Sequence, residues 1–323
     1  MVTISEYEYS NRTVYGIKSD VARYTWAGYH LFVIISSLTG DTTILVACIK
    51  HKALKLHRVI TVVIQHIAIC DLGVCMTVIF PRFVSILADG WVFGQFLCYF
   101  TAYMKYYLNL SSMFLISIMT TNKLLLLQYP LRFGTTTSRK AHLFCLTCWL
   151  VAFTFPAAGL LVDSQDIHFS YRSYHCSYGY STRADILQWL IPILTSLPLI
   201  STCQVVGTTI CLLIKAKQCA QRCQDSLKWQ GIMATVLTAT VFCISVLPYT
   251  VYSAGQMMVD VDDESESFFF TSFVRIGISC LALNTISNFY IYCLTVLSFR
   301  EFVRSRIELT WEFFSTKLGF SDS

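Results

Sequence analysis

Seven long runs of mostly apolar residues, separated by shorter polar segments, dominate the chain. They cover residues 27–50, 59–84, 97–127, 141–162, 186–214, 230–257 and 269–297. About 20 mostly apolar residues form a helix that crosses roughly 30 Å of hydrocarbon. The runs lack the alternation that marks membrane strands, and backbone groups in lipid pair within a helix. The pattern therefore predicts an all-α membrane protein, a bundle of seven transmembrane helices.

The composition excludes the main alternatives to a membrane bundle. Apolar residues make up 55% of the 323 residues and charged residues 13%, about half the roughly 25% that a soluble domain carries. The 23 Phe and 18 Tyr residues are too many for a disordered chain. Fourteen cysteines are too dilute for a small disulfide-stapled protein. No repeat or linker divides the chain, so we predict one bundle over residues 27–297.

Positive charges are distributed unevenly over the segments between the runs. The first, third and fifth connections and the C-terminal segment hold 15 of the 24 Lys and Arg residues, whereas an acidic run (260–266) lies on the other side. Cytoplasmic loops are rich in Lys and Arg. We therefore predict a plasma-membrane protein with an extracellular N-terminus (1–26) and a cytoplasmic tail (298–323). Its helices would contact membrane lipids. The net charge of +5 reflects this asymmetry and does not indicate nucleic-acid binding.

Two cysteines differ from the rest in their predicted position. Twelve of the 14 fall in predicted helices or on the cytoplasmic side, where thiols stay reduced. The exceptions are Cys98, at the outer start of the third run, and Cys176, in the long loop after the fourth. We predict a disulfide between them that holds this loop over the mouth of the bundle. On the same side, the sequon Asn11-Arg12-Thr13 predicts glycosylation at Asn11.

Short motifs recur in order along the predicted helices. They are Gly40-Asp41, Ala68–Leu72 with Asp71, Trp91–Gly94 before Cys98, Tyr129-Pro130-Leu131, Trp149, Pro198, Phe242 with Pro248, Asn288 with Tyr292, and Ser298–Phe302. Together they resemble the rhodopsin family of G-protein-coupled receptors across essentially the whole chain. The resemblance implies a receptor that passes the binding of an extracellular ligand to a heterotrimeric G protein through outward movement of the sixth helix. It also implies an amphipathic eighth helix from Ser298.

The family motif that contacts the G protein is altered in this chain. Its Asp-Arg-Tyr triplet falls on Asn122-Lys123-Leu124. Lys123 keeps the charge of the arginine but lacks its planar, bidentate fork. Asn122 is neutral, and Lys228 stands where the sixth helix often has an acid, so the family's resting ion pairs cannot form. The resemblance assigns coupling to these four residues and Tyr292, with a less favoured resting state.

Three other switch positions also depart from the family. Val246 replaces the sixth-helix tryptophan, Val206 the fifth-helix tyrosine and Phe289 the seventh-helix proline. The resemblance survives these changes, but ordinary switching does not follow from it. An atypical, constitutive or decoy receptor with weak G-protein coupling is therefore an alternative.

Two carboxylates fall within apolar runs. Asp71 resembles the family's sodium-site aspartate, and Asp41 replaces an asparagine expected beside it. Two adjacent carboxylates in an apolar bundle do not both stay ionised without a cation. One interpretation is a sodium or proton site formed by Asp41, Asp71, Asn284 and Asn288. The other is that one carboxyl stays protonated and hydrogen-bonds its neighbour. We expect no other metal or cofactor.

A lysine stands where ligands enter in the resemblance. Amine receptors have an aspartate at the third-helix position of Lys105, so an ammonium ligand would be repelled. An intramembrane lysine usually faces a cavity or a partner. Arginines and tyrosines near it predict a site for an anionic small molecule or lipid acid. The predicted ligand-binding residues are Lys105, Arg82, Tyr106, Tyr249, Tyr252 and Arg275, with Tyr103 and Tyr107 nearby.

Other interpretations stay open. Arg82 and Arg275 would equally snorkel to the interface, and Lys105 would pair with a carbonyl group or with Asp185. A peptide ligand is an alternative, because the acidic N-terminus and residues 260–266 would attract a basic partner. An enzyme is not expected, since no nucleophile–base pair, zinc spacing or phosphate loop occurs, and the histidines suggest packing roles. Residues 269–297 lack the lysine that a retinal Schiff base needs, and no inverted repeats indicate a transporter.

Overall fold

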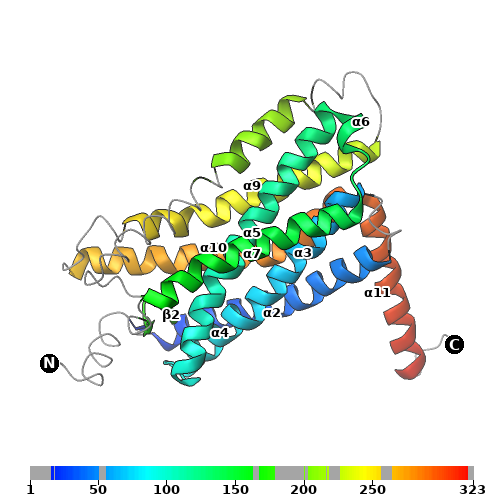
Figure 1. The fold of residues 1–323 in the computed structure, drawn as a ribbon. Helices are drawn as coiled ribbons and strands as arrows, with labels where there is room; N and C mark the ends of the chain where they lie inside the picture. The colour runs from blue at the N-terminus through cyan, green and yellow to red at the C-terminus, as the bar shows by residue number, and fades with distance from the viewer. Residues whose placement is uncertain are drawn as a thin grey trace.

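The protein is a bundle of long helices with a small β-hairpin at one end (Figure 1). The computed structural model describes residues 16–17, 19–50, 56–162, 167–178, 200, 203–215, 217, 226–255 and 264–318. We call the end of the bundle that carries the hairpin the hairpin end. The opposite end, where the short helix α6 (Pro130–Phe133) lies, is the α6 end.

The helices follow the predicted runs closely. Within the described residues, five are long and apolar enough to cross a membrane, by length and composition. They are α2 (Asp20–Ile49), the helix Arg58–Leu87, α5 (Gly94–Gln128), α9 (Ser226–Gly255) and α10 (Glu264–Thr295). The predicted fourth run coincides with α7 (Ser138–Val162), and Cys203–Lys215 is helical at the end of the predicted fifth. The rest of that run lies outside the described residues.

Helix α5 lies within the bundle and organises its packing. It contacts α3 (Arg58–Val74), α7 and α9, whereas α10 packs against α9 and α2. Leu115 and Ile116 of α5 join the buried side chains Phe242 of α9 and Tyr292 of α10 in the main apolar core. A further helix, α11 (Leu297–Leu318), begins where the eighth helix was predicted and turns away from the bundle at the α6 end (Figure 1).

The helix Arg58–Leu87 contains one wide turn. Segment α3 passes through a π-helical turn, η1 (Cys75–Ile79), into α4 (Phe80–Leu87). Pro81 at the start of α4 has no backbone N–H to donate, and such turns accommodate a missing helical bond. A wide turn also changes the direction of the side chains that follow it. Arg82 is buried, 4% exposed, and does not snorkel to an interface.

Gly277 lets α10 lie directly on the backbone of α9. A Cβ at this position would lie 3.0 Å from the backbone nitrogen of Tyr249, one residue after Pro248. Backbone atoms cannot rotate away, so the two helices would have to separate. Changing Gly277→Ala should therefore lower the free energy of unfolding by about 1–3 kcal/mol. Gly28→Ala is the matched control, because a Cβ on Gly28 meets nothing within 4 Å. Equal melting temperatures for the two purified variants would contradict this packing.

Candidate functional site

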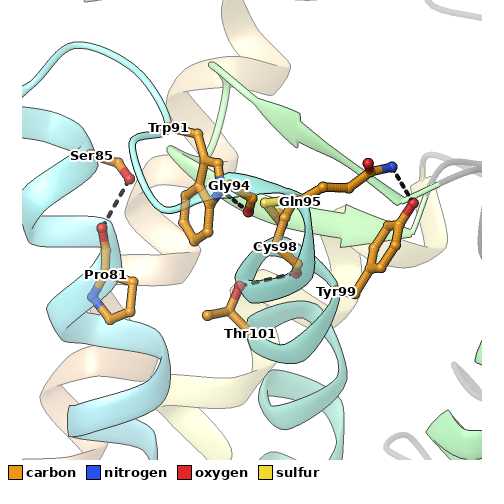
Figure 2. The surroundings of a disulfide bond; sticks show 9 residues. Pro81, Ser85, Trp91, Gly94, Gln95, Cys98, Tyr99 and Thr101 are labelled. Atoms are coloured by element: carbon orange, nitrogen blue, oxygen red, sulfur yellow. Dashed lines mark hydrogen bonds between the residues drawn. A yellow bond between two sulfur atoms is a disulfide. The ribbon is translucent and has the colours of Figure 1, made fainter.

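A disulfide joins the start of α5 to the hairpin. The bond between Cys98 and Cys176 confirms the predicted pairing. Figure 2 shows Cys98 in the first turns of α5, where its backbone carbonyl group accepts a hydrogen bond from the Thr101 hydroxyl. The helix begins at Gly94 with φ of 76°, a left-handed conformation that suits glycine. The Trp91 indole donates to the Gly94 carbonyl group at 2.8 Å and fixes this corner.

The hairpin consists of two short antiparallel strands, β1 (Ile167–Ser170) and β2 (His175–Tyr178). Tyr174 in its turn donates to the Asp89 carboxylate at 2.8 Å and accepts from the Ile17 amide at 3.1 Å. Burial, first of all, and the nearby Asp89 raise the pKa of Tyr174 to about 12, so its phenol remains a donor at neutral pH. Arg275 of α10 donates to backbone carbonyl groups of the hairpin turn. The hairpin is thus tied to three other parts of the chain.

Beneath the hairpin, Lys105 of α5 meets His175 of β2. The Lys105 ammonium nitrogen lies 2.5 Å from His175 Nε2, and His175 Nδ1 lies 3.4 Å from the Ser173 carbonyl oxygen. A carbonyl group only accepts, so Nδ1 carries the proton and Nε2 accepts from Lys105. Burial, then the positive charges of Lys105 and Arg82, lower the pKa of His175 well below its usual value. The imidazole is therefore neutral at pH 7.

Two aromatic rings and a second cation surround Lys105. Its ammonium group lies 4.7 Å from the ring centre of Tyr249 on α9 and 5.2 Å from that of Tyr106. Arg82 acts electrostatically on both Lys105 and His175, and its Nε has no hydrogen-bond partner among the described residues. Lys105 is 3% exposed. Neither cation forms a salt bridge within the described part of the chain, so the site has an excess of positive charge.

Some of the predicted ligand-binding residues lie close together in the structure, and others do not. Lys105, Arg82, Tyr106 and Tyr249 lie together, whereas Arg275 binds the hairpin turn. The side chain of Tyr252 lies outside the described residues, as do Asn11 and Asp185.

Two tyrosines near the predicted site face another helix. The Tyr103 hydroxyl donates to the Phe153 carbonyl group, and Tyr107 packs against Trp149, so both turn towards α7.

Sequence reasoning missed two histidines at the hairpin end. His175 was expected to have a packing role, but it accepts a hydrogen bond from Lys105. Its position next to the disulfide cysteine Cys176 was the available signal, because the bond holds this segment over the bundle. His30 on α2 is fully buried, with Nε2 lacking a hydrogen-bond partner among the described residues, and Arg82 acts on it electrostatically. No signal in the sequence distinguished His30.

At the α6 end, Lys123 of α5 is buried against α9. It is 5% exposed, and its Nζ lies 2.8 Å from the position of a Cβ on Gly231. Tyr292 is buried in the main apolar core, with its ring against Phe299. Asn122 turns to another side of α5, and Leu124 is half-buried. The side chain of Lys228, three residues before Gly231, lies outside the described residues.

The two carboxylates lie between α2, α3 and α10. Asp41 accepts from the Ser37 hydroxyl at 2.6 Å, and Asp71 accepts from the Asn288 amide at 2.8 Å. Both are 1% exposed and repel one another. Asp41 Oδ1 and Asn288 Oδ1 are buried without a donor among the described residues.

These oxygens fit a small hard cation. The two unpaired acceptors and the two carboxyl groups supply the oxygen ligands that such ions prefer. No group of three His, Cys, Asp or Glu side chains in the described part of the chain is arranged to hold a metal ion. Asn284 is half-buried, and its backbone carbonyl group accepts a hydrogen bond from the Ser287 hydroxyl.

Comparison with known proteins gives a family match and several similar relatives. The family model described as 7 transmembrane receptor (rhodopsin family) matches residues 40–292. The type-1 angiotensin II receptor A of Xenopus laevis is 24% identical over 252 residues, covering 71% of this chain and 64% of that receptor. Human melanopsin is 27% identical over 134 residues, covering 41% of this chain and 28% of melanopsin. The matched part thus spans less than two thirds of either relative.

Proposed function

This chain belongs to the rhodopsin family of seven-transmembrane receptors, and we propose that it transmits the binding of an anionic extracellular ligand to a heterotrimeric G protein. The ligand class is a small molecule or lipid acid with a carboxylate or phosphate group. The membrane is the plasma membrane, with the hairpin end outside and the α6 end in the cytoplasm. The excess of Lys and Arg in segments predicted to be cytoplasmic supports this orientation.

The observation that carries the ligand class is the charge at the hairpin end. Lys105 and Arg82 are buried together, with His175 neutral and no salt bridge to either cation within the described residues. An anion would offset both charges and favour the ammonium form of Lys105. The rings of Tyr106 and Tyr249 beside it suit an apolar body. An amine ligand would meet repulsion instead.

For transmission, we propose outward movement of α9 away from Lys123. Tyr249 contacts both Lys105 and the α10 backbone at Gly277. A ligand bound at Lys105 would therefore shift the equilibrium between the closed and the open packing of α9 through Tyr249. Moving α9 would separate Gly231 from Lys123 and open a cleft for the G protein. Lys123, freed from its burial, would then supply the charge that the family's arginine provides.

A test of this mechanism is basal G-protein activation in cells. Gly231→Ala places a methyl group 2.8 Å from Lys123 Nζ, which disfavours the closed packing of α9. A shift of about 1 kcal/mol in a two-state equilibrium corresponds to about a fivefold change in population, so basal activation should rise about fivefold. Lys123→Ala should lose basal activation at equal surface expression.

The double variant separates this contact from general damage to the helix. In the Lys123→Ala background, Gly231→Ala no longer displaces the lysine, and its Cβ meets only the tip of Leu56, at 3.3 Å, so it should change little further. Gly207→Ala is the control, since a Cβ there meets nothing within 4 Å. If Lys123→Ala retained full activation, Lys123 would not be a coupling residue. Silence of every form with ligand present would favour the decoy alternative.

We also propose that Asp41 and Asp71, with the Asn288 oxygen, bind a sodium ion that stabilises the closed bundle. Replacing potassium by sodium at tenfold above the dissociation constant should add about 1.4 kcal/mol to the unfolding free energy. Asp71→Asn should abolish this difference because it removes one of two repelling carboxylates. Asp20→Asn, a change at an exposed carboxylate of α2, should leave it intact. A sodium effect unchanged by Asp71→Asn would contradict the site.

A further inference from the structure

A cavity lies at the α6 end, remote from Lys105. Its volume is about 560 Å³, within the range of small-molecule sites. Its apolar wall comes from several helices, including Val63 of α3, Ile118 of α5 and Phe144 of α7. Phe144 is 56% exposed on the outer surface of the bundle. In a membrane protein, such a surface contacts lipid chains.

Two cations lie at the edge of this cavity. Arg132 of α6 and Lys140 of α7 both line it, and both are exposed. Neither forms a salt bridge with any residue that the structure describes, and the Arg132 guanidinium carbon lies 5.8 Å from the ring centre of Phe133. Lys and Arg near a membrane surface attract anionic headgroups. The combination of an apolar wall and a cationic edge matches an acyl chain joined to a phosphate.

One buried polar group that lines the cavity has no hydrogen-bond partner among the described residues. The side-chain oxygen of Asn122 is buried and accepts no hydrogen bond from the described residues, and Asn122 lines the same cavity. An unsatisfied buried acceptor costs free energy unless a donor reaches it. A hydroxyl or ammonium group of a lipid headgroup would supply this donor, which an acyl chain alone cannot do.

We propose that this cavity binds one anionic phospholipid of the leaflet at the α6 end. The acyl chain lies along Ile118 and Phe144, the phosphate binds Arg132 and Lys140, and a headgroup donor reaches Asn122. Among the described residues that line the cavity, none belongs to α9 or α10. The lipid therefore occupies a different face of α5 from the one on which Lys123 meets Gly231. This site is separate from the proposed ligand site and, of the residues that the resemblance assigns to coupling, it includes Asn122.

The test is native mass spectrometry of the full-length receptor released from detergent micelles. The micelles contain equal amounts of phosphatidylglycerol and phosphatidylcholine with the same acyl chains. The wild type should retain one phosphatidylglycerol molecule in preference to phosphatidylcholine. R132Q/K140Q should lower the retained fraction about tenfold, since each cation near the surface contributes to the attraction. R139Q/R300Q is the matched control, because it removes two exposed cations that do not line the cavity.

Equal loss in both double variants would overturn the site, because diffuse attraction would then explain retention. No preference in the wild type would overturn it as well, and would favour a cytoplasmic protein segment as the occupant. A second variant, Ala141→Leu, fills the apolar part without changing charge, since Ala141 lines the cavity. It should also reduce retention, whereas unchanged retention would exclude the acyl chain from the cavity. Soluble glycerol 3-phosphate should not compete at the concentrations at which phosphatidylglycerol binds; full competition by it would overturn a lipid site.

Discussion

Changing Lys105→Met should weaken an anionic ligand about 100-fold. Truncating one member of a buried charged contact costs about 3 kcal/mol, which corresponds to this factor. Methionine keeps the length of the lysine and its contact with the Tyr249 and Tyr106 rings, so loss of charge is the main change. The measurement is binding of the most potent carboxylate or phosphate found by screening the wild-type receptor. Tyr103→Phe, a change on the same helix facing α7, should keep the wild-type affinity.

The same substitution also tests how the contact between Lys105 and His175 contributes to stability. Lys105→Met alone leaves His175 Nε2 without its donor, which costs about 1–3 kcal/mol. Lys105→Met with His175→Leu removes both polar groups, and buried charges are often replaced by apolar groups with a gain in stability. The double variant should therefore melt higher than either single variant. If ligand affinity survived Lys105→Met, the anion site would be wrong, and a response to basic peptides would favour the peptide alternative.

Much of the bundle could be predicted from the sequence, because lipid imposes a simple rule on it. Runs of apolar residues must be helical in hydrocarbon. The run 97–127 falls within α5, and the runs 27–50 and 269–297 fall within α2 and α10 except at their last one and two residues. The helix ends were less predictable. Polar residues such as Asp20 and Glu264 extend two helices beyond their apolar runs, since intrahelical hydrogen bonds continue outside the hydrocarbon.

The site was only partly predictable, because its contacts join distant parts of the chain. The disulfide followed from the predicted positions of Cys98 and Cys176, because the other twelve cysteines fall in predicted helices or on the cytoplasmic side. The contact of Lys105 with His175 depends on hairpin geometry that apolar runs do not encode. The burial of Arg82 depends on the wide turn before Pro81, and propensities did not reveal it. The cavity beside Asn122 depends on the relative positions of several helices, α3, α5, α6 and α7 among them.

Removing the disulfide should have the largest effect on stability. The bond joins residues 78 apart, for which a chain-entropy model gives about 4.5 kcal/mol at 25 °C. Helices that persist in the denatured membrane protein reduce this value, so we expect a loss of about 2–4 kcal/mol for Cys98→Ser with Cys176→Ser. Melting temperatures of the purified receptors measure it. Cys203→Ser, a change at an exposed free cysteine, should have little effect.

The disulfide variant should also weaken the anionic ligand, because Cys176 adjoins His175 and positions it over Lys105. The remaining ties of the hairpin, from Tyr174 to Asp89 and from Arg275, contribute about 0.5–1.5 kcal/mol each and do not replace a covalent bond. Tyr174→Phe should therefore lower affinity far less than loss of the disulfide. A reducing agent should lower the melting temperature of the wild type but not of the double variant. Unchanged affinity with lowered stability would show that the hairpin covers the bundle without contributing to the ligand site.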